Sequence, residues 1–91
     1  MHGATEVMAE MRAALERAFA PSRLEILDDG ARHAGHREAG RGHYRVLVVS
    51  DAFRGRRPLE RHRMVYQALS PLLESSVHAL NITARTVDET H

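Results

Sequence analysis

Histidine is the residue whose number and spacing in this chain most readily suggest chemistry. Seven histidines occur among 91 residues, and His33 and His36 stand three positions apart in the sequence HAGH. His78 directly precedes a segment of alternating apolar residues. Neutral imidazole is a common ligand of transition metals. The pair by itself is weak evidence for a metal site, because closed zinc sites need four ligands and solvated loop histidines are the commoner explanation.

Arginine forms a second concentration of candidate binding residues. Residues 31–63 hold nine arginines against three acidic residues, a charge of +6, whereas residues 1–30 and 64–91 are acidic. Arginine binds phosphate and carboxylate in bidentate fashion, so this region could meet nucleic acid or a protein partner. Only four Phe or Tyr residues are available for base stacking, and a solvated cluster tied to Glu60 and Asp51 is the alternative. The candidate surface consists of Arg54, Arg56, Arg57, Arg61, His62 and Arg63.

Several classes of function are disfavoured by what the sequence lacks. There is no cysteine, which excludes a disulfide framework, a thiol nucleophile and a metal site completed by the chain's own thiolates. No serine has the glycine neighbours of a nucleophile elbow, and no glycine pair has phosphate-loop spacing, so we expect no enzyme. The longest clearly apolar run, Val46 to Val49, is too short to span a membrane. The charged start lacks a signal-peptide core, and a cytoplasmic protein is the expectation.

Hydrophobic periodicity predicts a single domain over residues 1–91, with its core at about 5–86. The first two strands should form an antiparallel hairpin with a long connection, and a helical crossover allows the second and third to lie parallel. An α+β domain follows, with a three-stranded mixed sheet and helices on one face. We expect, in order, a helix over 4–19, a strand over 23–29, a loop over 30–42, a strand over 43–50, a helix from 58 broken at Ser70-Pro71, a strand over 78–86 and a frayed tail over 87–91.

The stretch FRGRRPLERHRMVY, residues 53–66, resembles the signature of the BolA family of stress-induced morphogen proteins. That signature is Phe-x-Gly, a short spacer, then Arg-His-Arg followed by an apolar residue and often tyrosine. The segments LEILDDGARHAGH, GHYRVLVVSDAF and VHALNITA resemble further parts of the family, so the resemblance extends from about Leu15 to Thr86. Gly30 departs from the pattern, since the family usually has serine there, and the C-terminal tail is shorter than in several members.

The resemblance implies an αββααβ domain similar to class II KH modules, in agreement with the order of elements expected from periodicity. KH modules clamp RNA with a glycine loop. No two glycines of this chain stand three apart, which argues against that mode of binding.

The resemblance also implies a function: a non-enzymatic adaptor that pairs with a monothiol glutaredoxin and shares a [2Fe–2S] cluster with it. Its role would be iron–sulfur cluster maturation or iron signalling, with the glutaredoxin and glutathione supplying thiolates and this chain supplying histidine. By position, His78 is the ligand candidate, His33 the loop candidate and His36 the alternative loop ligand. Such clusters are held mainly by thiolates, although imidazole can replace thiolate on one iron. The chain alone is therefore expected to be a monomer that binds no cluster.

A second function is implied by family members that are DNA-binding transcriptional regulators of stress response and cell morphology. That role would use the Arg54–Arg63 basic region on double-stranded DNA, above all Arg61, His62 and Arg63. Part of the Arg-His-Arg sequence could instead only stabilise the start of its helix and the adjoining loop.

Overall fold

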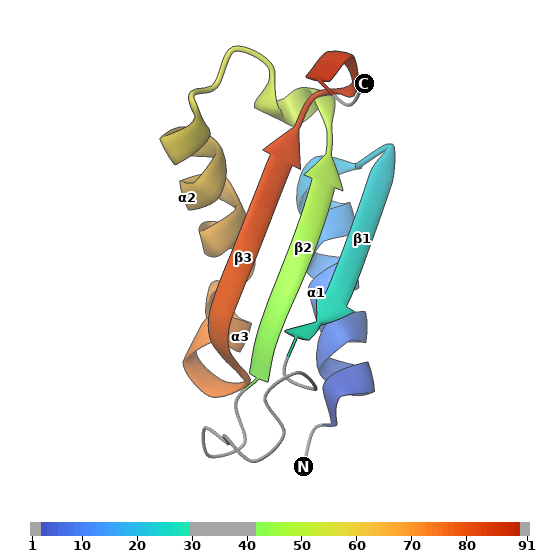
Figure 1. Ribbon diagram of the computed structural model, residues 1–91, viewed down its shortest axis with the longest axis vertical. Coiled ribbons are helices and arrows are strands. Elements are labelled where there is room, and N and C mark those ends of the chain that lie inside the picture. The colour runs from blue at the N-terminus through green and yellow to red at the C-terminus, as the bar shows by residue number, and fades with distance from the viewer. Residues whose placement is uncertain (1–2, 30–41, 90–91) are drawn as a thin grey trace.

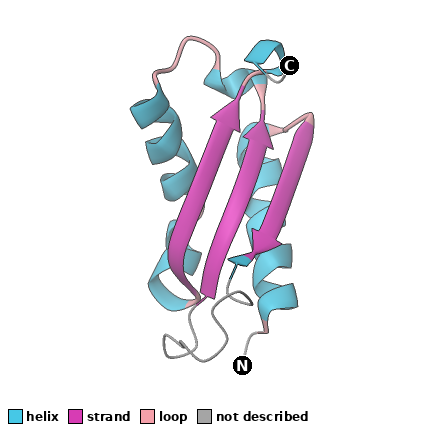
Figure 2. Cartoon of the chain, in the orientation of Figure 1, coloured by secondary structure: helices cyan, strands magenta, loops and turns pink. Residues whose placement is uncertain are grey.

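The computed structural model describes residues 3–29 and 42–89 of the 91-residue chain. Its elements follow one another in the predicted αββααβ order (Figures 1 and 2). They are α1 (Ala4–Phe19), β1 (Arg23–Asp28), β2 (Gly42–Val49), the 3-10 turn η2 (Asp51–Phe53), α2 (Pro58–Ala68), α3 (Ser70–Ser75), β3 (Val77–Arg85) and the 3-10 turn η3 (Val87–Glu89).

The sheet has the order β1-β2-β3, with β1 antiparallel and β3 parallel to β2. The parallel pair is possible because α2 and α3 carry the chain back along the sheet before β3 begins. Figure 1 shows the helices together behind the three strands. The predicted fold class, an α+β domain with a three-stranded mixed sheet and helices on one face, is confirmed.

The core lies between the sheet and the helices because the strands alternate. In β2, Tyr44, Val46 and Val48 are buried, whereas His43 and Arg45 lie on the opposite face, which we call the open face. The rings of Phe19 and Phe53 lie 5.0 Å apart and join the end of α1 to η2. Other buried apolar side chains are Val7, Met11, Leu15, Val65, Leu69, Val77 and Ile82.

The bounds of all three strands differ from expectation by one residue, and the tail also differs. β2 begins at Gly42, so the predicted loop loses its last residue, and residues 30–41 lie outside the described part of the chain. The tail was expected to fray from residue 87, but Val87–Glu89 forms a 3-10 turn. In this turn the Glu89 carboxylate accepts hydrogen bonds from the Arg61 guanidinium and from the backbone N–H of Thr86. Across residues 3–29 and 42–89, no helix combines the length and apolar content that a membrane crossing would require.

Candidate functional site

The described backbone places His78, and the two residues that flank segment 30–41, at one end of the sheet. His78 is the second residue of β3; nothing is described of its side chain, and His33 and His36 lie outside the described residues. Residues 29 and 42, which flank the segment 30–41, both lie at this end. The Gly42 N–H donates to the Ser76 carbonyl at 3.1 Å, and Gly42 is paired with Val77. The segment that carries His33 and His36 thus returns to the sheet beside the start of the strand that carries His78.

A cleft of about 260 Å³ opens at the same end of the sheet. It is lined by Asp29, His43, Tyr44, Ala79, Leu80 and Asn81. Ala79 is the neighbour of His78 along the chain and the register partner of His43. His43 therefore adds an imidazole to the end of the sheet where β2 and β3 begin, which we call the candidate metal end. His43 was not among the predicted site residues. Because residues alternate along a strand, the sequence places His43 on the face opposite Tyr44. Only the pairing of β2 with β3 shows that it lies beside Ala79.

The described residues at this end offer imidazole, carboxylate and amide groups as possible ligands. Within residues 3–29 and 42–89, no three histidine or carboxylate side chains are grouped so as to hold a metal ion. The whole chain has no cysteine. Iron–sulfur clusters are held by thiolates with imidazole as an occasional replacement. These residues can therefore contribute imidazole to a cluster whose thiolates come from another molecule.

Gly42 allows the chain to enter the sheet beneath an aromatic ring. A Cβ at this position would lie 2.7 Å from Cε2 of Tyr44, closer than a real Cβ contact allows. Burial, and secondarily the negative charge of Asp28, raise the pKa of the Tyr44 hydroxyl. The tyrosine, which is one of the residues that line the cleft, is therefore neutral at physiological pH.

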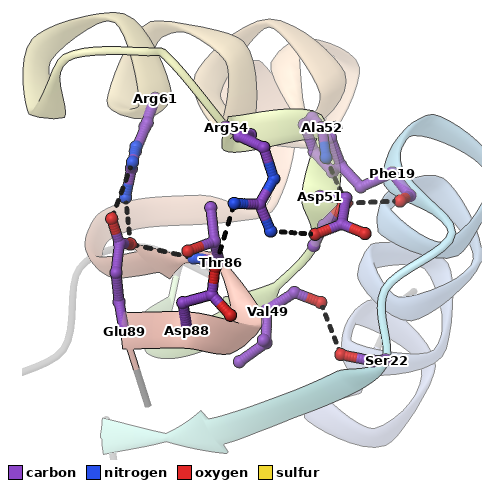
Figure 3. A network of polar contacts seen from close by, with 11 residues as sticks. Phe19, Ser22, Val49, Asp51, Ala52, Arg54, Arg61, Thr86, Asp88 and Glu89 are labelled. Carbon is purple, nitrogen blue, oxygen red and sulfur yellow. Dashed lines mark hydrogen bonds and ion pairs between the residues drawn. The ribbon is translucent and has the colours of Figure 1, made fainter.

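Arg61, one of the predicted binding residues, is hydrogen-bonded within the fold (Figure 3). Its side chain is only 12% exposed. The guanidinium donates to the carbonyls of Arg56 and Ala84 at 2.9 and 3.1 Å, and to both carboxylate oxygens of Glu89 at 2.6 and 3.1 Å. It thus ties the loop before α2 to the end of β3 and to η3.

Arg54 and Arg56 also form ion pairs with acidic side chains of the same chain. Arg54 is bonded to Asp51 at 3.0 Å and to Asp88 at 2.9 Å, so η2 and η3 share one guanidinium (Figure 3). Arg56 lies 3.9 Å from the Glu60 carboxylate. The alternative of an arginine cluster tied to neighbouring acids is therefore confirmed for these two residues, and their charges are partly compensated.

Arg57, His62 and Arg63 remain as the exposed part of the predicted surface. In the described part of the chain, no ion pair involves Arg57 or Arg63. Proline at the first position of α2 and a 2.9 Å bond from the Arg57 N–H to the Glu60 carboxylate set the helix start. Arg57 therefore lies at the cap of α2, and His62 and Arg63 lie within the helix.

The candidate metal end and the loop before α2, which carries Arg54, Arg56 and Arg57, lie at opposite ends of the sheet. β2 and β3 both run from the Gly42–Val77 pair to the Val49–Arg85 pair, and η2 follows immediately after β2. Figure 1 shows the loop before α2 and the C-terminal turn together at the far end from residues 29 and 42. Nine residues of β3 separate the two ends by roughly 26 Å.

Comparison with known proteins identifies relatives over most of the chain. A family model described as BolA-like protein matches residues 15–89. BolA-like protein 1 of Mus musculus is 46% identical over 80 residues, which are 88% of this chain and 58% of the mouse protein. The DNA-binding transcriptional regulator BolA of Escherichia coli (strain K12) is 43% identical over 76 residues, covering 82% of this chain and 70% of that protein. The chain thus spans less than two thirds of the mouse relative.

Solved structures give the same result. BolA1 from Arabidopsis thaliana superimposes with a TM-score of 0.84 at 30% identity, covering 100% of both chains. The BolA domain of SufE1 from the same plant has a TM-score of 0.83 at 37% identity, covering 99% of this chain and 100% of that one. The sequence signature, the αββααβ order and the match over residues 15–89 agree, and this chain belongs to the BolA-like family.

Proposed function

We propose that this chain is a non-enzymatic adaptor that pairs with a monothiol glutaredoxin and supplies histidine to a [2Fe–2S] cluster held between the two proteins. The observation that carries the proposal is the parallel pairing of β2 and β3. It places the start of β3, and with it His78, beside the point where the histidine-containing segment 30–41 rejoins the sheet.

The chemistry of the chain supports a ligand donor rather than a catalyst. When bound, the cluster would supply redox or transferable iron–sulfur chemistry, and the partner's thiolates would hold most of it. His78 is the first candidate ligand, and His33 or His36 the second. A ligating imidazole needs its other nitrogen hydrogen-bonded so that ring and tautomer are fixed. Asp29 and Asn81 in the adjoining cleft bring a carboxylate and an amide close to this end of the sheet.

The test is reconstitution of the mixed complex. The chain is combined with a monothiol glutaredoxin, glutathione, iron and sulfide, and visible circular dichroism is recorded. We expect a spectrum distinct from that of the glutaredoxin alone, and its loss with His78→Ala. His62→Ala, which removes an exposed imidazole from α2, is the matched control and should leave the spectrum intact. A spectrum unchanged by His78→Ala, in a variant with wild-type far-ultraviolet signal, would reject the proposal.

The same assay assigns the second ligand. His33→Ala and His36→Ala are compared under identical conditions, together with His43→Ala because His43 lines the neighbouring cleft. We expect one of the two loop variants to change the spectrum strongly and the other weakly. A dominant effect of His43→Ala would instead assign the second position to β2.

DNA binding is the second candidate function, favoured by the printed name of the Escherichia coli relative and by the exposed cations of α2. In this role Arg57, His62 and Arg63 would contact phosphates, whereas Arg54 and Arg61 are already bonded to acids. Binding to a 20-base-pair duplex should then weaken steeply with salt and fall with Arg63→Glu. His78→Ala should not affect it, which separates this function from the cluster adaptor.

A further inference from the structure

The outward side of α2 carries large apolar side chains beside its cations. Leu59 is 61% exposed and Tyr66 is 41% exposed, and His62 and Arg63 between them are exposed as well. Positions 59, 62, 63 and 66 are separated by three, four and seven residues, so they share one face of the helix. We call these four residues the α2 stripe.

The stripe is not part of the core. The core side of α2 is formed by Met64, Val65 and Ala68, which the helical period places on the opposite side. Among the described residues, Leu59 and Tyr66 are two of only four large apolar side chains that are exposed. On this face Leu59 and Tyr66 lie two helical turns apart, with His62 and Arg63 between them.

The charge around the stripe is positive. Glu60 is the single acidic residue of α2, and it lies off the stripe. Its carboxylate is engaged with Arg56 and with the backbone N–H of Arg57. Arg57 and the amino-terminal end of the helix add positive potential next to Leu59.

Nucleic acid fits this surface less well than a protein segment. Arg54 and Arg61, which would have extended the positive surface, are paired with Asp51, Asp88 and Glu89. Exposed leucine and tyrosine flanking one arginine provide apolar contact that phosphates cannot use. Acidic amphipathic helices bury such apolar strips and pair their carboxylates with arginine.

We propose that the α2 stripe is a docking surface for a protein partner that presents an acidic segment with apolar side chains at helical spacing. The surface is separate from the proposed cluster end. Three residues lining the cleft, His43, Ala79 and Asn81, belong to the open face of the sheet, whereas α2 lies against the other face. The α2 stripe and the proposed cluster end therefore do not share a face of the molecule.

The experiment is a selection from a random 15-residue peptide display library on the immobilised full chain. Counter-selection uses the Leu59→Ser/Tyr66→Ser variant, whose changes lie on the solvent side of α2 and spare the core. Dissociation constants of recovered peptides are measured by fluorescence anisotropy with wild type, this variant, Arg63→Glu, and the control Arg17→Glu, which changes an exposed arginine of α1.

We expect enriched peptides rich in Asp or Glu with Leu or Phe at helical spacing. Their affinity should fall at least tenfold with Leu59→Ser/Tyr66→Ser and with Arg63→Glu, and stay unchanged with Arg17→Glu. The proposal is overturned if no peptides are enriched, if those recovered lack an acidic excess, or if they bind the double variant equally well. A duplex DNA affinity that requires Leu59 and Tyr66, without peptide enrichment, would assign the stripe to nucleic acid instead. Cluster formation by the double variant is scored separately, so failure here leaves the adaptor proposal standing.

Discussion

At the scale of single residues, the family signature divides into a buried part and an exposed part. Phe53 is fully buried, and Gly55 adopts a φ of +77°, a left-handed conformation that side chains rarely tolerate. Arg61 is enclosed by hydrogen bonds to the backbone and to Glu89. His62 and Arg63 are exposed. One continuous motif therefore combines residues that shape the loop before α2 with residues that remain available to a partner.

The Arg61–Glu89 pair leads to a prediction about acid stability. The hydrogen bond from Arg61, followed by that from the Thr86 N–H, lowers the pKa of the Glu89 carboxyl from 4.5 to about 2. Because the folded-state pKa is the lower one, the pair stabilises the fold above pH 4.5, and this contribution is lost as the pH falls towards 2. Glu89→Gln should therefore lower the melting temperature at pH 7, and its difference from wild type should shrink between pH 4.5 and 2.

Thermal unfolding followed by far-ultraviolet circular dichroism at stepped pH provides the measurement. Glu74→Gln, which changes an exposed carboxylate of α3, is the control and should follow wild type at each pH. A Glu89→Gln difference that stays constant down to pH 2 would contradict the assignment.

At the scale of elements, the entry into β2 joins the histidine-containing segment to the sheet. Tyr44 is 4% exposed and its ring leaves no space for a side chain at position 42. The register between β2 and β3 shifts between Gly42 and His43, directly beside the start of β3. The close approach of the aromatic ring thus favours glycine at position 42, where the chain enters β2 beside the start of β3.

Gly42→Ala should destabilise the protein by about 1–3 kcal/mol, because the added methyl group displaces the Tyr44 ring from the core. The cost should be smaller in a Tyr44→Ala background, which removes the obstructing ring. Urea denaturation of the two single variants and the double variant measures this coupling. Strictly additive free energies of unfolding would show that the ring and the glycine are independent.

At the scale of the whole molecule, the sheet acts as a spacer between two candidate binding regions. The proposed cluster end lies where β2 and β3 begin, and the loop that carries Arg56 and Arg57 lies beyond the end of β2. The acidic turn η3 folds back at this far end and compensates part of its positive charge (Figure 3). Partners at the two ends need not exclude one another.

Charge reversal at the far end therefore tests this separation. Arg56→Glu/Arg57→Glu should leave the visible spectrum of the complex with glutaredoxin unchanged, while His78→Ala abolishes it. The double variant should lose affinity for a DNA duplex if the second candidate function holds. Loss of the cluster spectrum with Arg56→Glu/Arg57→Glu would indicate that the glutaredoxin also contacts the loop before α2. It would contradict the separation of the two candidate binding regions.

The order and type of the elements were predictable from sequence, because helical and strand periodicity are local patterns of apolar residues. The absence of cysteine likewise determined that a cluster would need thiolates from elsewhere. Which residues meet across the fold was not predictable in the same way. The placement of His43 beside the start of β3 depends on parallel strand pairing. Arg61 is bonded to Glu89, 28 residues away, so only the tertiary structure separated the arginines that are bonded within the fold from those that remain exposed.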